Sequence, residues 1–266
     1  MKFRLVGTKD FSIFSLKKHK TISVLSLFFA IASSFYSPNV SAHWNSLPTL
    51  SVFEEPSQIL NNDPCNANSS VRNISGYITK VSDGDTVKVD NGEEIFSIRM
   101  LGIDTPETKY FGKSQGYWGE VASETLHSIL PIGTKVTVKF DRTRCDGWKR
   151  VLGYVYMGTK NINRQMLEES LAVNYCIFPN IQHCQDFSEV TKKSVANHEG
   201  IFGDRMLELP YVWRKKIRNG KMDKYVGSLY KNEVYYPQHY ERFGIAERIF
   251  YMRQKDVLPP KRFVKE

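Results

Sequence analysis

The sequence predicts an α+β fold built on a small, five-stranded Greek-key barrel with about three helices. Five short strand patterns bounded by turn residues favour the barrel, at about 75–82, 86–90, 94–102, 134–140 and 151–156. One amphipathic helix pattern lies between the third and fourth strands, and two more helix patterns follow the fifth. Five short strands with a helix after the third are typical of barrels of the OB type.

The first two strands are joined by a short turn that carries two aspartates. The run Gly76 to Val81 leads into Asp83-Gly84-Asp85, and Asp-Gly between two strand patterns is the strongest short hairpin signal. Asp85 is therefore expected at the start of the second strand. Pro106 lacks a backbone donor and ends the third strand, so Asp104 is expected at the end of that strand.

Hydrophobic periodicity and turn residues predict the remaining elements. The helix pattern from Tyr117 to Leu130 has one apolar face, and Pro131-Ile132-Gly133 ends it. Apolar and polar residues alternate along the fourth predicted strand. Arg150 stands at the start of the fifth. The two later helices are expected at about 163–170 and 187–198.

Four segments are expected along the 266 residues: a signal peptide (1–42), a linker or arm (43–72), the barrel domain (73–205) and a basic, aromatic-rich C-terminal extension (206–266). The apolar run Ile22 to Ala32 follows three lysines and is too short to span a bilayer comfortably, and Val40-Ser41-Ala42 offers a cleavage site. The mature protein is therefore expected to be secreted or periplasmic, with no stable membrane span. A retained N-terminal membrane anchor is the alternative.

Positive charge is concentrated in the C-terminal extension. Residues 206–266 hold 14 Lys and Arg against seven Asp and Glu, whereas residues 43–205 hold 17 against 20. The extension also contains eleven aromatic side chains: Tyr211, Trp213, Tyr225, Tyr230, Tyr235, Tyr236, Tyr240, Phe243, Phe250, Tyr251 and Phe263. Interleaved basic and aromatic residues can follow a nucleic-acid strand. The alternatives are a packed appendage whose aromatics form a core and a docking surface for a protein partner.

Four cysteines favour disulfides over a metal site. None of them has CxxC spacing or an accompanying histidine pair, which argues against zinc. An even number of cysteines in an exported protein is typical of disulfide bonds. Of the three possible connectivities, we favour Cys176–Cys184, which closes a short loop, with Cys65–Cys145.

Charged residues of both signs gather where the predicted strands end. Asp85 and Asp104, on adjacent strands, can meet around a hard cation, which prefers oxygen ligands. The forked guanidinium groups of Arg99 and Arg150 match phosphate oxygens in a bidentate way. Together these residues favour a phosphodiester site, and a surface turn with a salt bridge is the alternative.

Three motifs in this order resemble those of the staphylococcal nuclease (thermonuclease) family: Asp83-Gly84-Asp85-Thr86, Arg99 through Lys109, and Arg150 through Tyr154. The resemblance covers about residues 73–205 and implies the same OB-type barrel. Three positions depart from the family pattern. Trp148 stands where Tyr is common, and Lys149 and Ser170 stand where Gly is usual.

The resemblance also implies a role for each matching residue. Asp85, Asp104 and the backbone carbonyl of Thr105 would bind Ca²⁺, and Glu107 would orient or deprotonate the attacking water. Arg99 and Arg150 would hold the phosphate and stabilise the charge of the transition state.

The expected function is that of an exported calcium-dependent endonuclease acting on DNA, with RNA left open as a second substrate. The alternative is a non-catalytic envelope or assembly component that uses the nuclease fold to bind nucleic acid or protein.

Overall fold

The computed structural model describes residues 63–66 and 69–264. The predicted signal peptide, 1–42, and most of the predicted arm, 43–72, lie outside the described residues. Among the helices that the structure describes, none is long and apolar enough to cross a membrane.

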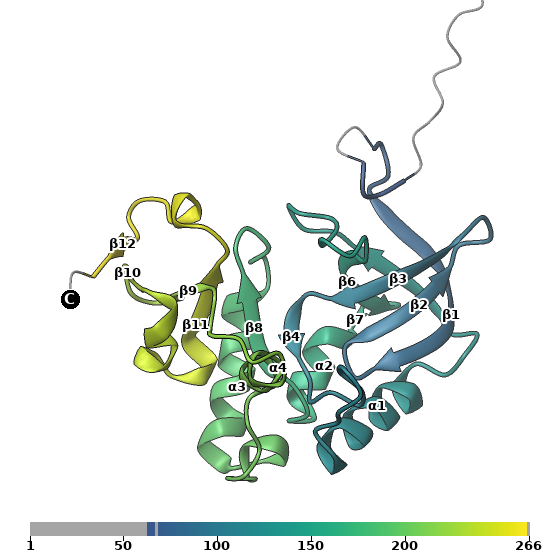
Figure 1. Ribbon diagram of the computed structural model, residues 1–266. Helices are drawn as coiled ribbons and strands as arrows, with labels where there is room; N and C mark the ends of the chain where they lie inside the picture. Colours follow the sequence, from purple (N-terminus) through teal and green to yellow (C-terminus); the bar gives the residue numbers. More distant parts are fainter. Residues whose placement is uncertain (1–62, 67–68, 265–266) are drawn as a thin grey trace, which may run out of the picture. The chain divides into compact units, whose positions relative to one another are not determined.

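The first sheet has six strands in the order β3-β2-β1-β5-β6-β7 (Figure 1). Their bounds are β1 (Asn73–Asp83), β2 (Thr86–Asp90), β3 (Ile95–Met100), β5 (Lys135–Lys139), β6 (Val151–Met157) and β7 (Lys160–Asn161). Neighbours in this order are antiparallel, and β3 also pairs with β6 in parallel, which closes the sheet. The predicted five-stranded barrel is confirmed, with the two-residue β7 as an addition.

The barrel interior follows the two-residue period of its strands. Alternate side chains of β1, β2 and β3 are buried in one core: Ile74, Ile78, Val87, Val89, Phe96, Ile98 and Met100. Helix α1 (Tyr117–Ile129) packs against β1 and buries Ala122 and Leu126. Gly76 is required on β1, because a Cβ there would lie 2.2 Å from the carbonyl oxygen of Asp90.

The third predicted strand is broken in two by a bend at Leu101. β3 ends at Met100, and β4 (Gly102–Asp104) leaves the barrel to pair with β8 (Val173–Ile177) of a second sheet. Gly102 has φ of 75°, and a Cβ on it would lie 2.8 Å from the ring of Phe187. A side chain at this position would therefore meet both backbone strain and a clash. The bend places Asp104 at the end of β4 rather than of β3.

Two helices follow the barrel close to their predicted positions. They are α2 (Ile162–Glu168) and α3 (Cys184–Asn197). Asn161 caps α2, since its side chain accepts a hydrogen bond from the backbone N–H of Arg164. α3 begins three residues before the predicted start, at a cysteine that is bonded to β8.

The C-terminal extension forms most of the second sheet, which the sequence analysis did not predict. The strand order is β12-β10-β9-β11-β8-β4 (Figure 1). Its strands from the extension are β9 (Tyr225–Ser228), β10 (Glu233–Tyr235), β11 (Arg248–Tyr251) and β12 (Arg262–Phe263). Helix α4 (Pro210–Ile217) precedes them, and short 3-10 segments lie at Gly200–Phe202, Pro237–Arg242, Ile245–Glu247 and Gln254–Asp256.

Most aromatic side chains of the extension pack rather than face solvent. Phe250 is 0% exposed and contacts Tyr175 of β8 and Tyr211 of α4, whose rings stack with centroids 5.0 Å apart. Tyr211 and Phe250 belong to the same buried cluster as the barrel residues. Tyr230 and Tyr236 are the exposed exceptions among the eleven. These contacts favour the interpretation of the extension as a packed appendage over its interpretation as an exposed aromatic surface that binds nucleic acid.

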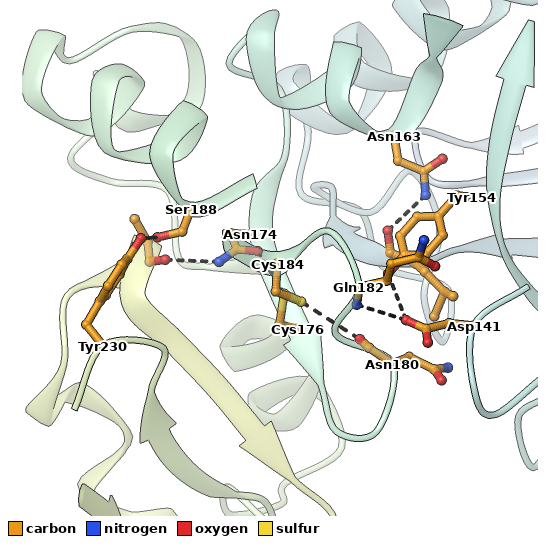
Figure 2. The surroundings of a disulfide bond; sticks show 12 residues. Asp141, Tyr154, Asn163, Asn174, Cys176, Asn180, Gln182, Cys184, Ser188 and Tyr230 are labelled. Atoms are coloured by element: carbon orange, nitrogen blue, oxygen red, sulfur yellow. Dashed lines mark hydrogen bonds between the residues drawn. A yellow bond between two sulfur atoms is a disulfide. The ribbon is translucent and has the colours of Figure 1, made fainter. Parts of the chain in front are cut away.

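Both favoured disulfides are present. Cys65 is bonded to Cys145, and Cys176 on β8 is bonded to Cys184 at the start of α3. Figure 2 shows the second bond in the region where the barrel domain meets the extension, with Tyr230 donating a hydrogen bond to Ser188 of α3. The two disulfides and the shared core therefore tie the described parts of the chain together.

We predict that Phe250→Ala lowers the free energy of unfolding of the whole described fold by about 3–5 kcal/mol, the usual cost of truncating a buried phenylalanine. Urea unfolding, followed by tryptophan fluorescence and circular dichroism, measures this loss. Met252→Ala, at a neighbouring exposed side chain, is the matched control and should change stability by about 0.5 kcal/mol or less. A loss below about 1 kcal/mol for Phe250→Ala would mean that the extension is not part of the cooperative unit.

Candidate active site

Two carboxylates meet where the β1–β2 hairpin approaches the end of β4. Asp83 pairs with Thr86, so the predicted hairpin has the two-residue loop Gly84-Asp85, and Asp85 lies one residue before β2 rather than at its start. The side chain of Asp85 is nearly buried, and Asp104 is 0% exposed. Asp85 Oδ2 accepts a hydrogen bond of 3.1 Å from the backbone N–H of Thr105. The predicted ligands Asp85, Asp104 and Thr105 are thus brought together.

Arg99 joins these carboxylates from β3. Its Nη2 lies 3.0 Å from Asp85 Oδ2 and 2.7 Å from Asp104 Oδ1. Its Nη1 donates to the backbone carbonyls of Met100 and Ile103 at 2.8 and 3.0 Å. Four acceptors therefore hold the guanidinium in one orientation at the bend between β3 and β4.

Glu107 lies on the loop after β4 and faces the same cluster. Its backbone N–H donates to Gln115 Oε1, and its Oε1 lies 2.5 Å from Arg214 Nη1. Burial, followed by the charge of Asp85, raises the pKa of Glu107 to about 8, although Arg214 acts to lower it. The carboxyl group of Glu107 is therefore a much stronger base than an exposed glutamate.

The pKa values of two neighbouring acids, Asp83 and Asp104, are also raised. Burial, followed by the charge of Asp85, raises the pKa of Asp83 to about 6. Burial also raises the pKa of Asp104, although Arg214 and Arg99 act to lower it. Asp83 accepts hydrogen bonds from the backbone of Gly84 and Thr108 at 2.9 and 3.4 Å, so it supports the two loops.

Arg150 does not join this cluster through any contact that the structure describes. Its Nε lies 2.7 Å from Asp146 Oδ2, and its guanidinium lies 5.4 Å from the ring of Trp148. The strand that follows Arg150 pairs with β3, where Ile98 is opposite Val151, so its backbone lies next to the strand of Arg99.

The two departures from glycine occur at left-handed backbone positions. Lys149 has φ of 60° and Ser170 has φ of 56°, values at which glycine is favoured and a side chain is strained. Ser170 Oγ donates a 2.8 Å hydrogen bond to Ser194 Oγ, which offsets part of that cost. Lys149 stands beside the exposed ring of Trp148, at the turn that carries Arg150.

Arg214 is the site residue that the sequence analysis missed. It comes from α4, more than 100 residues after the carboxylates, and its side chain is 18% exposed. Its Nη1 and Nη2 lie 2.8 and 2.9 Å from the two oxygens of Asp104. The extension's positive charge was the available signal, but a charge excess does not identify which side chain reaches a site.

The donor set fits a hard cation. Asp85 and Asp104 offer carboxylate oxygens, and the described residues contain no group of three or more His, Cys, Asp or Glu side chains that could hold a metal. A cation here would therefore also need backbone or water oxygens, as Ca²⁺ commonly uses. The buried Thr105 hydroxyl has no hydrogen-bond partner in the described part of the chain, which leaves one polar atom available beside Asp85.

Sequence comparisons find similarity to one protein family and to several nucleases. The family described as "Staphylococcal nuclease homologue" matches residues 97–204. The thermonuclease of Staphylococcus hyicus is 30% identical over 127 residues, covering 48% of this chain and 75% of that protein. The endonucleases YhcR and YokF of Bacillus subtilis (strain 168) are 27% and 33% identical over 187 and 136 residues, covering 66% and 48% of this chain. The chain spans only 15% and 46% of the length of these two relatives.

We predict that, without divalent cations, the free energy of unfolding falls as pH rises from about 4.5 to about 8. The folded chain keeps protons on Glu107 and Asp83 that the unfolded chain, with ordinary pKa values of 4.5 and 3.8, has already released. Each such group contributes a slope of at most about 1.4 kcal/mol per pH unit. Urea unfolding in the presence of a chelator, at several pH values across this window, measures the slope.

Glu107→Gln should make this slope shallower, because glutamine does not titrate. Glu124→Gln, at an exposed position of α1, is the matched control and should keep the wild-type slope. An unchanged slope in Glu107→Gln would contradict the raised pKa of this residue.

Proposed function

Because the chain belongs to the staphylococcal nuclease family, we propose that it is an exported calcium-dependent nuclease. Its substrate is DNA, and RNA is a second substrate to be tested. The observation that carries the proposal is the Arg99 guanidinium bridging Asp85 and Asp104, with Glu107 in the same cluster. Two buried carboxylates that can hold a metal, an arginine fork and a basic glutamate are groups that can promote phosphodiester hydrolysis.

Asp85, Asp104 and the carbonyl of Thr105 would hold the cation. When bound, Ca²⁺ would neutralise part of the negative charge on the phosphate and polarise its oxygen atoms. The alignment of β4 with β8 and the hydrogen bond from Thr105 to Asp85 keep these three donors next to each other.

Glu107 would take the proton of the attacking water. Burial raises the pKa of this group to about 8 in the metal-free chain, so its carboxylate has a high affinity for a proton. Gln115 holds the backbone of Glu107 at 3.1 Å and keeps the loop in position.

Arg99 and Arg150 would bind the phosphate oxygens. Negative charge on these oxygens grows as the fifth bond to phosphorus forms, so donors held in place stabilise the transition state more than the substrate. Arg99 is held in place by two backbone carbonyls. Arg150 would break its ion pair with Asp146 and bind the phosphate instead.

The two disulfides support an oxidising compartment, which in this proposal is the periplasm or the medium. A second candidate function is a non-catalytic component that keeps the nuclease fold for binding. The ion pairs of Arg214 favour it, because they occupy Asp104 and Glu107, which catalysis needs.

An assay of the purified chain on DNA and RNA, with Ca²⁺ or with a chelator, tests the proposed function. Glu107→Gln should lower kcat on the order of 100-fold, because the general base is lost while the side chain keeps its shape. Glu124→Gln on α1 should retain wild-type activity. Wild-type activity in Glu107→Gln, or undiminished activity in excess chelator, would favour a different mechanism.

We further predict that Arg99→Lys lowers kcat by about 100-fold, since lysine keeps the positive charge and loses the planar fork. Circular dichroism checks that the variant is folded. Arg142→Lys, at an exposed loop position, is the matched control and should have no effect. An equal loss of catalysis in Arg142→Lys would show that the assay responds to replacement of any arginine by lysine, and not to the fork of Arg99 in particular.

A further inference from the structure

We propose that Arg214 of the C-terminal extension is a built-in competitor for the cation site. In the metal-free chain its guanidinium occupies the carboxylate that the cation needs, so the extension sets the calcium affinity of the site. This inference rests on the proposed metal role of Asp85 and Asp104.

The contacts of Arg214 leave little of Asp104 free. Oδ1 of Asp104 accepts a hydrogen bond from Arg99 Nη2 at 2.7 Å and forms an ion pair with Arg214 Nη1 at 2.8 Å. Oδ2 of Asp104 accepts a hydrogen bond from Arg214 Nη2 at 2.9 Å. Arginine nitrogens therefore lie within 3 Å of both oxygens of this carboxylate. A cation that binds through Oδ1 must therefore displace one of the two arginines.

A cation on Oδ2 would meet the same group. Ca²⁺ binds oxygen at about 2.3–2.6 Å, so it could lie no farther than about 5.5 Å from the Arg214 nitrogen that shares this oxygen. Two positive groups at this separation in a buried site repel strongly, because little water screens them. Cation binding and the Arg214 contacts are therefore in competition.

Arg214 is better placed than Arg99 to leave. Arg99 is held by Asp85 and by two backbone carbonyls besides Asp104. The hydrogen bonds described for Arg214 are to Asp104 and Glu107 only, and its side chain is the more exposed of the two, at 18% against 13%. A long, flexible side chain can rotate outward while its helix stays in place.

Helix α4 itself is anchored against the site. Gln115 accepts from the backbone of Glu107 and donates to the carbonyl of Glu208, two residues before α4. Trp118 of α1 donates to Asp204, and Tyr211 of α4 stacks on Tyr175 of β8. These contacts hold the backbone of α4 beside the cluster, so Arg214 stays within reach of the carboxylates as a competitor.

Calcium binding to the chelator-stripped full chain, measured by isothermal titration calorimetry, tests the inference without an activity assay. Arg214→Met keeps the aliphatic bulk and removes the charge, and we expect its Kd for Ca²⁺ to be lower by about tenfold or more. Lys216→Met, an exposed residue of the same helix, is the matched control and should keep the wild-type Kd. Arg214→Lys should lie between wild type and Arg214→Met.

If Arg214→Met does not fold without metal, circular dichroism measured with and without Ca²⁺ replaces the binding measurement as the test. Folding of the variant on addition of Ca²⁺ supports the inference, because the cation then replaces the lost guanidinium. A variant that stays unfolded at saturating Ca²⁺ overturns it.

The outcomes separate this inference from the proposed function. Calcium binding by wild type with an equal or higher Kd in Arg214→Met overturns the competitor role alone. Absence of calcium binding in both proteins overturns the metal assignment itself, and the competitor role with it. Asp85→Asn should weaken binding in both backgrounds if the cation occupies the assigned site.

Discussion

The local structure of the site depends on the repulsion between four acidic groups that the fold brings together. Asp83, Asp85, Asp104 and Glu107 converge from the hairpin, from β4 and from the loop that follows it, where burial and mutual repulsion raise the pKa of three of them. Arg99 and Arg214 supply two positive charges, so the fully ionised cluster keeps an excess of two negative charges. Protons can relieve this excess in the metal-free chain, and a divalent cation can relieve it when bound.

The bend at Leu101 is what brings Asp104 into this cluster. Without the positive φ of Gly102, β3 would continue in the barrel, and Asp104 would not turn back toward Asp85. The same bend gives β4 to the second sheet, where it pairs with β8. One backbone position therefore joins the barrel to the second sheet and completes the carboxylate cluster.

The C-terminal extension is part of both the core and the site. Strand β11 pairs with β8 and buries Phe250 in the core that the barrel shares, and α4 brings Arg214 to Asp104. The competitor role of Arg214 and the packing of the extension are linked through Tyr211, which lies one helical turn before Arg214 and stacks on β8. A loss of packing in the extension would therefore change the position of Arg214 relative to the carboxylates.

Local patterns in the sequence predicted the barrel, the hairpin between β1 and β2, and helices α1, α2 and α3, and they favoured the two disulfides that the structure has. Asp-Gly specifies a tight turn through its own backbone preferences, and strand and helix periods depend on nearby residues. The convergence of Asp85, Asp104 and Arg99 could be predicted for the same reason, since they lie within 20 residues of each other, on strands or in the short loop that joins two strands.

The tertiary structure alone decided the second sheet and the contact of Arg214 with the carboxylates. The strands of the extension are two to four residues long, too short for a period to stand out. They are stabilised by pairing with one another and, through β11, with β8, rather than by local propensity. Arg214 meets Asp104 across 110 residues of sequence. An arginine in a basic helix has the same local pattern whether it faces water or a buried carboxylate, so only the packing of α4 against the site determines its partner.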